Sequence, residues 1–450
     1  MATIALDKST MPRLSASARL DRLPIGSFHK QIMWIVAYIY FFELGDLNNF
    51  GLAAPELRKL WKLSISAIGI ITSAAFFGMF VGALCGGWFS DKLGRKKALI
   101  LTTLWYSLSS LLNAFAWNEP TLFVTRFLTG VGLSAMTVVA MTYVSEMFPA
   151  TKRGTYQGWI LMIGLFGIPF SALAARVFIP LGTFGWRLVF VWGALGTFVV
   201  IFASKIQESP LWYESKRRFS EADAVLDRIE AESIAKSGPL PPVANAPPAK
   251  PQTAKADGLF SPAYRARTLM LIGVYVFQTL GLFGFMAWVP TLLASRGFPV
   301  AKSLLLTTIM YFGAPVGALI ASQISDRWQR KDMIAIIAVL IGGIGVVYGL
   351  SVKTVPIIIL GFLVAMFIQT FAPMLYSYTP EIYPTSTRSS GSGLAYGAGR
   401  LANVAGPVLI AFLFNHLGYV SVFVYIAAMW ALVAVIVTLF GPKTKGVALT

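Results

Sequence analysis

The stretch Gly87–Lys97 reads Gly-Trp-Phe-Ser-Asp-Lys-Leu-Gly-Arg-Lys-Lys, and it separates two long apolar runs. Residues 66–90 on one side and 98–117 on the other contain no charged side chain. A helix of about 20 residues spans a bilayer core roughly 30 Å thick. A short basic segment between two such runs therefore predicts a tight loop joining two transmembrane helices.

The same alternation continues along the chain. Of its 450 residues, 56% are hydrophobic and 12% charged, with a mean hydropathy of +0.69. Soluble domains carry about 25% charged residues, and their cores cannot hold so many uninterrupted apolar runs. We therefore expect an all-α membrane protein of twelve transmembrane helices, at roughly 31–53, 66–90, 97–117, 120–145, 156–179, 187–205, 268–294, 303–325, 332–351, 355–379, 389–414 and 418–440.

The two halves of the chain repeat each other. Glu146–Arg153 ends the fourth predicted span, and Glu381–Arg388 ends the tenth with Glu, Pro and Arg at identical spacing. An offset of 235 residues relates three pairs of positions: Pro149 and Pro384, Asp91 and Asp326, and Ser209 and Thr444. Six helices repeated in parallel predict two bundles related by a pseudo-twofold axis along the membrane normal, with a cavity between them.

This repeat divides the chain into bundles 31–205 and 268–440, a polar linker 206–267, and tails 1–30 and 441–450. Basic residues cluster at alternate loops, which by the positive-inside rule predicts that both tails and the linker are cytoplasmic. The bias has exceptions on the predicted outer side, namely Arg58, Lys59, Lys62 and Arg296.

The net charge and the cysteine content indicate which partners and which cellular compartment to expect. The net charge of +18 follows from these loop clusters, so nucleic acid is not the expected partner. The single cysteine, Cys85, cannot form an intrachain disulfide, and no Asn-X-Ser/Thr sequon occurs. We expect a monomer surrounded by lipid in a bacterial inner membrane.

The Gly87–Lys97 stretch resembles the loop motif of the major facilitator superfamily, G-x-x-x-D-R/K-x-G-R-K/R-K/R, and matches every defined position. Gly94 permits a tight turn, and Asp91 can pair with a basic side chain or a helix N-terminus across the inner face of the bundle. Such pairs would hold the halves together while the cytoplasmic side is closed. The alternative is a basic anchor that only sets topology. The second copy has Ser322 and Gln329 in place of the glycines, so we expect the first half to contribute more to the gate than the second.

Further motifs resemble the sugar-porter-like branch of that superfamily. They are Arg126-x-x-x-Gly-x-Gly, the segment Glu146–Gly154, and Glu208-Ser-Pro. Lys443 departs from this branch, which usually has an acid there. The chain is also similar to bacterial niacin transporters and animal organic-ion transporters, in three segments: Phe42–Asp46, Tyr378–Pro384 and Gly391–Pro407.

Ionisable residues within spans are the candidates for coupling, because each costs at least ~2.5–3.5 kcal/mol at mid-bilayer. Glu43 and Asp46 lie three residues apart on one helical face, and Arg126 lies early in the fourth span. The resemblance implies that Asp46 and Arg126 form a proton switch, in which protonation breaks the pair and lets the halves rock. The alternative is a static structural pair. Glu43 is either a proton relay or a packing residue.

Arg400 lies in the middle of the eleventh span without an acid nearby in its own helix, so it needs an anionic partner. In the animal relatives, an arginine at the matching place accompanies organic anions. We therefore expect Arg400 to bind a substrate carboxylate, and a permanent pair with a carboxylate on another helix is the alternative. Amide and aromatic side chains that suit a flat heteroaromatic acid complete the predicted site: Asn403, Gln278, Phe283, Trp288, Tyr311, Gln369, Tyr376 and Tyr396.

The predicted gating residues are the charged members of the loop motifs: Asp91, Arg95, Glu146, Arg153, Asp326, Arg330, Glu381 and Arg388. No metal-ligand spacing, phosphate-binding loop or nucleophile–base pair stands out, so we expect no metal, no cofactor and no enzymatic activity.

The predicted function is proton-coupled uptake of a small organic anion, such as a niacin-like aromatic monocarboxylate, by alternating access. A sugar or polyol symporter is the first alternative, although Gln278-Thr-Leu-Gly lacks the paired glutamines and asparagine typical of sugar binding. A membrane sensor on the same scaffold is the second, and the retained Asp46 and Arg126 argue against it.

Overall fold

The computed structural model describes residues 14–202, 205–242, 259–262, 264–324, 328–383 and 387–444, and every regular element in these ranges is a helix. The first half contains α2 (Ser27–Trp61), α3 (Ile65–Leu93), α4 (Arg95–Ala114), α5 (Glu119–Met147), α6 (Ala150–Leu165), α7 (Gly167–Phe178), α8 (Gly185–Ala194) and α9 (Val199–Phe202). The second half contains α12 (Arg265–Met286), α13 (Val289–Ser295), α14 (Val300–Tyr311), α15 (Gly313–Ile324), α16 (Arg330–Leu350), α17 (Thr354–Glu381), α18 (Arg388–Leu417) and α19 (Tyr419–Phe440).

These helices match the twelve predicted spans. In the described part of the chain, nine helical units are long and apolar enough to cross a membrane. The other three predicted spans correspond to α2, which carries several polar residues at mid-length, to the Ser/Thr-rich α4, and to α8 and α9, which a 3₁₀ turn (Leu195–Phe198) separates. Three further spans are each built from two shorter helices: α6 with α7, α12 with α13, and α14 with α15.

The helix ends follow local chemistry. Ser64 and Asn118 cap α3 and α5 by accepting hydrogen bonds from backbone N–H groups of the first turn. Between α3 and α4 the chain turns at Gly94, whose φ of 97° is a conformation that side chains with a Cβ rarely adopt. The turn in the Gly87–Lys97 stretch therefore depends on a glycine at this position.

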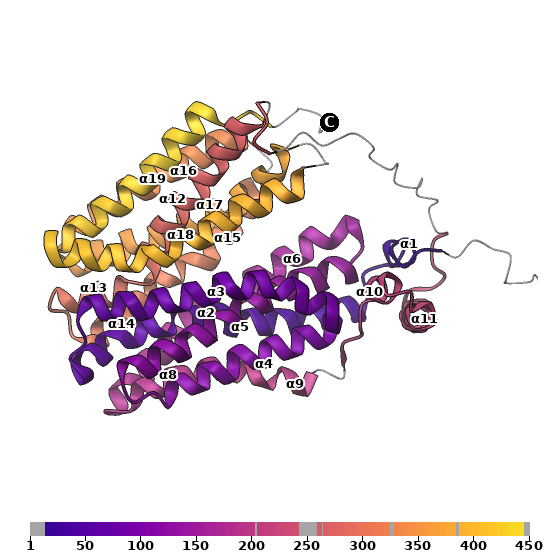
Figure 1. The fold of residues 1–450 in the computed structure, drawn as a ribbon, viewed down its shortest axis with the longest axis horizontal. Helices are drawn as coiled ribbons and strands as arrows, with labels where there is room; N and C mark the ends of the chain where they lie inside the picture. Colours follow the sequence, from indigo (N-terminus) through magenta and orange to yellow (C-terminus); the bar gives the residue numbers. More distant parts are fainter. Residues whose placement is uncertain are drawn as a thin grey trace, which may run out of the picture.

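The two halves lie face to face and diverge toward one end (Figure 1). At the end with α13 and α14 they meet: Gly51 of α2 lies so close to α12 that an added Cβ would be 2.5 Å from the Ala287 carbonyl oxygen. Further along the same seam, the Ser66 hydroxyl accepts a hydrogen bond from Asn415 of α18. The described ion pairs at the opposite end each join residues of one half.

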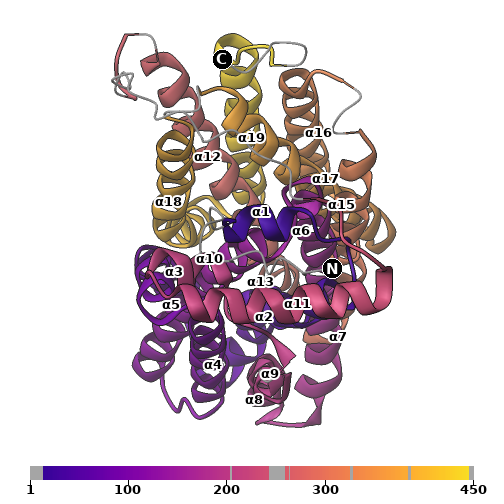
Figure 2. The same cartoon turned by 90° about the vertical axis from the view of Figure 1, so that its right-hand side faces the viewer.

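Three helices outside the bundles cover that opposite end: α1 (Ala16–Asp21), α10 (Pro210–Ser215) and α11 (Phe219–Ser237). Figure 2 shows α11 lying across the helix ends of the first half, beside α1. Arg19 of α1 pairs with Glu230 of α11 at 2.9 Å, and Arg22 pairs with the same carboxylate at 2.8 Å. Burial alone would raise the pKa of Glu230, but the hydrogen bonds from both arginines outweigh it and hold this pKa below its ordinary value.

Candidate functional site

Asp46 lies in the interior of the first half and has no exposed surface. Its Oδ1 accepts hydrogen bonds from Ser110 Oγ of α4 at 2.5 Å and from Asn49 Nδ2 at 2.8 Å. Its Oδ2 has no hydrogen-bond partner among the described residues and faces Arg126 Nη1 of α5 at 3.8 Å. One oxygen is thus held by neutral donors, and the other is left for a cation or a proton.

Arg126 is 2% exposed, and its Nε and Nη1 atoms have no hydrogen-bond acceptor in the described part of the chain. Its guanidinium carbon lies 5.8 Å from the centroid of the Phe50 ring. A buried guanidinium without a carboxylate is strongly destabilising. If Asp46 takes up a proton, the buried Arg126 therefore loses the negative charge that it faces.

Glu43 lies about one turn from Asp46 on the same face of α2 and is 3% exposed. Its Oε1 accepts a hydrogen bond from Thr137 Oγ1 of α5 at 3.1 Å, whereas Oε2 has no partner among the described residues. Arg400 on α18 lies within electrostatic range of Glu43. Because α18 belongs to the second half, this pair of charges connects the two halves.

Arg400 has weak local partners. Its Nε and Nη2 atoms lie 3.1 and 2.5 Å from the Tyr396 hydroxyl, and its Nη1 lies 3.9 Å from the Met79 sulfur of α3. A hydroxyl and a thioether are poor matches for the planar donor set of a guanidinium, which a carboxylate accepts bidentately. The role of Arg400 in binding an anion stays a prediction.

Aromatic rings surround this position. The Tyr376 ring stacks on that of Tyr275 at a centroid distance of 6.3 Å and meets that of Tyr396 at 6.2 Å. Tyr376 remains 47% exposed although it lies within a bundle helix. From the other side, Phe76 of α3 meets Phe283 of α12 edge-on at 4.8 Å. The predicted residues Phe283, Tyr376 and Tyr396 thus gather on the side of the second half that faces α3.

Asn403 also fits a binding role. It lies one turn from Arg400 on α18 and is 1% exposed, and neither of its side-chain amide atoms has a hydrogen-bond partner among the described residues. Gln278 is occupied locally, since its Nε2 donates to the Thr279 hydroxyl at 2.6 Å. Gln369 is partly exposed on α17. Their roles in binding stay predictions.

Two predicted site residues lie elsewhere. Trp288 and Tyr311 are each 1% exposed and pack in the hydrophobic core of the second half. The Tyr311 hydroxyl donates to the Met286 carbonyl oxygen, where α12 ends. A substrate contact for these two side chains remains a prediction.

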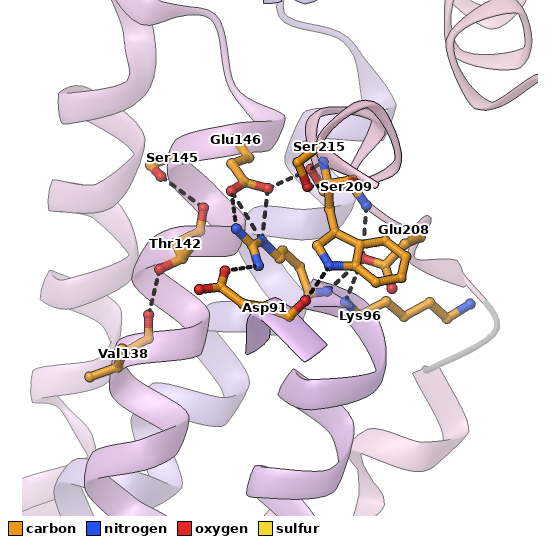
Figure 3. Close-up of polar contacts among 11 residues, drawn as sticks. Asp91, Lys96, Val138, Thr142, Ser145, Glu146, Glu208, Ser209 and Ser215 are labelled. Atoms are coloured by element: carbon orange, nitrogen blue, oxygen red, sulfur yellow. Dashed lines mark hydrogen bonds and ion pairs between the residues drawn. The ribbon is translucent and has the colours of Figure 1, made fainter. Parts of the chain in front are cut away.

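Three of the four predicted gating residues of the first half form one network (Figure 3). Arg95 pairs with Asp91 at 2.6 Å and with Glu146 of α5 at 2.8 Å, and Ser209 donates to the same Glu146 carboxylate at 2.5 Å. Glu208 accepts hydrogen bonds from the backbone N–H groups of Arg95 and Lys96 and so caps the N-terminus of α4. This network joins α3, α4, α5 and the start of the linker within one half.

The second half repeats this arrangement in part. Arg330 at the start of α16 forms an ion pair with Glu381 at the end of α17. Asp326 lies outside the described residues, as does the side chain of Arg388. Arg153 reaches the Phe148 carbonyl oxygen at 3.4 Å. A gate between the halves built from these residues therefore stays a prediction.

Sequence reasoning missed several partners in the site. Asn49 could have been found, because it follows Asp46 by three residues on the same helical face. Ser110, Thr137 and Met79 lie on other helices, and nothing in their local sequence distinguishes them from packing residues.

Comparison with known proteins agrees with this architecture. The model of the family described as "Sugar (and other) transporter" matches residues 28–450. The chain belongs to this family. It is therefore a membrane transporter of small molecules and not an enzyme, and its fold is that of the major facilitator superfamily.

Individual relatives support the assignment. The chain is 43% identical to the putative metabolite transport protein YyaJ of Bacillus subtilis (strain 168), over 99% of both chains. It is 30% identical to the niacin transporter NiaP of Acinetobacter baylyi, over 95% of this chain and 97% of that one. A solved structure of the xylose transporter XylE from E. coli, described as partially occluded and inward open, superposes with a TM-score of 0.75 at 18% identity over 94% of this chain and 100% of that one.

Proposed function

We propose that this transporter takes up a small aromatic or heteroaromatic monocarboxylate together with protons across a bacterial inner membrane, with both termini in the cytoplasm. The observation that carries the proposal is the Arg400 guanidinium, which lies at the junction of the halves among tyrosines. Among the described residues, only a hydroxyl and a thioether lie within its hydrogen-bonding reach. A carboxylate would satisfy this charge, and flat rings would stack on Tyr376 and Tyr396.

Proton coupling follows from the two buried acids of α2. A proton on Asp46 removes the charge that Arg126 faces at 3.8 Å, which destabilises the present packing of the first half and favours another arrangement of the bundles. Glu43 links this helix to the substrate position, because its charge acts on Arg400. When a substrate anion occupies Arg400, a neutral Glu43 avoids like-charge repulsion, so the anion and a proton would bind together.

Alternating access requires the seam at the α13 end to open and the other end to close. The backbone contact at Gly51 is at the closed end, and the charged networks around Glu146 and Glu381 lie at the divergent end. Those networks are placed to change partners when the two halves approach each other there.

The proposal is tested with purified protein in liposomes. An inward-directed proton gradient should drive accumulation of nicotinate or benzoate, while xylose and a neutral analogue such as nicotinamide should not accumulate. Accumulation of xylose instead would support the sugar symporter. Carboxylate accumulation that a protonophore leaves unchanged would refute proton coupling.

A further inference from the structure

The end of the bundle opposite α10 and α11 lies on the left side of Figure 1 and is called here the distal end. Its sequence segments are strongly basic. The segments 52–66, 114–122, 176–188, 287–303, 348–356 and 415–421 meet there, and all lie within the described residues. They contain only two acids, Glu56 and Glu119. They contain eight basic residues: Arg58, Lys59, Lys62, Arg176, Arg187, Arg296, Lys302 and Lys353.

Membrane topology does not explain this excess. The positive-inside rule favours basic residues on cytoplasmic loops, and these segments are predicted to lie on the outer side. Some of these cations have a local structural role: Arg187 donates to the Ala114 carbonyl oxygen, and Arg296 to that of Ser351. Arg58 and Lys59 at the end of α2 form no ion pair in the described part of the chain, and both line a groove.

The groove lies on the seam between the halves. It has a volume of about 550 Å³ and is bordered by the end of α2 on one side and by α13 and the start of α14 on the other, where Ala294 and Phe298 form part of the wall. The contact between Gly51 and Ala287 closes the same seam about one turn deeper. The groove is thus at the mouth of a passage that alternating access has to open.

A buried polar atom in its wall also lacks a partner. Thr291 of α13 is 1% exposed, and its hydroxyl has no hydrogen-bond partner among the described residues. Leaving such a donor unpaired in the protein interior is unfavourable. A negatively charged ligand that accepts a hydrogen bond would pair with this hydroxyl and with the cations of Arg58 and Lys59. The negative charge of Glu56 on the same rim offsets one of these two positive charges.

We propose that this groove is an anion-loading site on the outer face, where small organic carboxylates collect before the halves part. A cleft lined by one sign of charge focuses the field and raises the local concentration of counter-ions. The inference rests on the proposed function for the identity of the anion, and it adds a second, peripheral site to that function.

Charge-selective labelling tests the groove without any transport. A cysteine at Ala294, in a Cys85→Ala background, would be reacted with the anionic sulfonatoethyl and the cationic trimethylammonioethyl methanethiosulfonates. We expect the anionic reagent to react faster by roughly tenfold, and the ratio to fall toward one in the Arg58→Gln/Lys59→Gln variant or at high salt. Equal rates with both reagents in the parent protein would overturn the proposal.

Transport kinetics then test loading. In liposomes of neutral lipid at low ionic strength, Arg58→Gln/Lys59→Gln should raise the KM for nicotinate by roughly 3–10-fold with little change in kcat, and the difference should disappear at high salt. Thr291→Val should raise KM at both ionic strengths. Lys353→Gln removes a cation from the same end but outside the groove, and it should behave like the parent.

Three results would contradict loading at this groove. The first is an unchanged KM in the double variant, and the second is an equal effect of Lys353→Gln, which indicates a diffuse field. The third is an effect seen only with phosphatidylglycerol in the liposomes, which indicates that the cations hold lipid headgroups. The absence of any carboxylate transport would instead refute the proposed function, whereas the labelling ratio would still report on the groove.

Discussion

The buried pair of Asp46 and Arg126 allows a quantitative prediction. At 3.8 Å and an effective dielectric constant of about 20, the attraction between the two charges is about 4 kcal/mol. Desolvation offsets much of this, but removing one partner of a buried pair typically costs about 3–5 kcal/mol. Asp46→Asn leaves Arg126 charged at 2% exposure, with no acceptor for Nε or Nη1 among the described residues, so it should show a cost in this range.

Arg126→Gln should cost less. Asp46 keeps its hydrogen bonds from Ser110 and Asn49, and a buried carboxyl can take up a proton when its cation is removed. The double variant Asp46→Asn/Arg126→Gln contains neither buried charge and should be more stable than Asp46→Asn alone. A second mutation that restores stability is difficult to explain by anything except an interaction between the two residues.

The assay has two readouts. Thermal unfolding of the purified variants in detergent gives the order of stability, with Ser73→Ala as a control that removes a buried hydroxyl lacking a hydrogen-bond partner among the described residues. Transport in liposomes should show that Asp46→Asn loses proton-driven accumulation but retains substrate counterflow. If the double variant is destabilised by the full sum of the single effects, the two charges do not interact and the proposed switch is refuted.

Three further predictions concern other charged groups. Arg400→Ala should weaken carboxylate binding, measured by calorimetry, by roughly 10–100-fold, since a charged hydrogen bond contributes about 1.5–3 kcal/mol. Arg400→Lys should recover only part of the lost affinity. Unchanged affinity in Arg400→Ala would exclude the carboxylate site. Calorimetry in buffers of different ionisation enthalpy should show about one proton taken up per anion bound, and Glu43→Gln should abolish this uptake; the same uptake in the variant would assign the proton to another group. Arg19 and Arg22 hold the pKa of Glu230 low, so the contact between α1 and α11 should be complete above the ordinary carboxyl pKa of 4.5 and lost as the pH falls through the lowered pKa. Hydrogen exchange of residues 14–22 would measure this loss. Exchange that does not depend on pH, after correction for intrinsic rates, would contradict the prediction.

Much of the fold could be predicted from the sequence. Apolar runs long enough to span a bilayer identified the helices, the 235-residue offset identified the two halves, and Gly94 in the Gly87–Lys97 stretch indicated the turn that its positive φ requires. The main errors were at boundaries: α2 extends to Trp61 rather than to residue 53, and α12 ends at Met286 because the chain bends before Pro290. Both features depend on how the helix ends pack, which hydropathy does not report.

The candidate site could be predicted only in part. The sequence identified the charged residues Glu43, Asp46, Arg126 and Arg400, because an ionisable group inside a membrane helix is costly enough to stand out. The tertiary structure alone decided that Arg400 lies against Met79 and within electrostatic range of Glu43, and that Trp288 is packed in the core. The physical reason is that helices apolar on all sides carry little periodic signal in their sequence. Packing against neighbouring helices alone fixes how each helix is rotated about its axis, and this rotation decides which side chains face the junction between the halves.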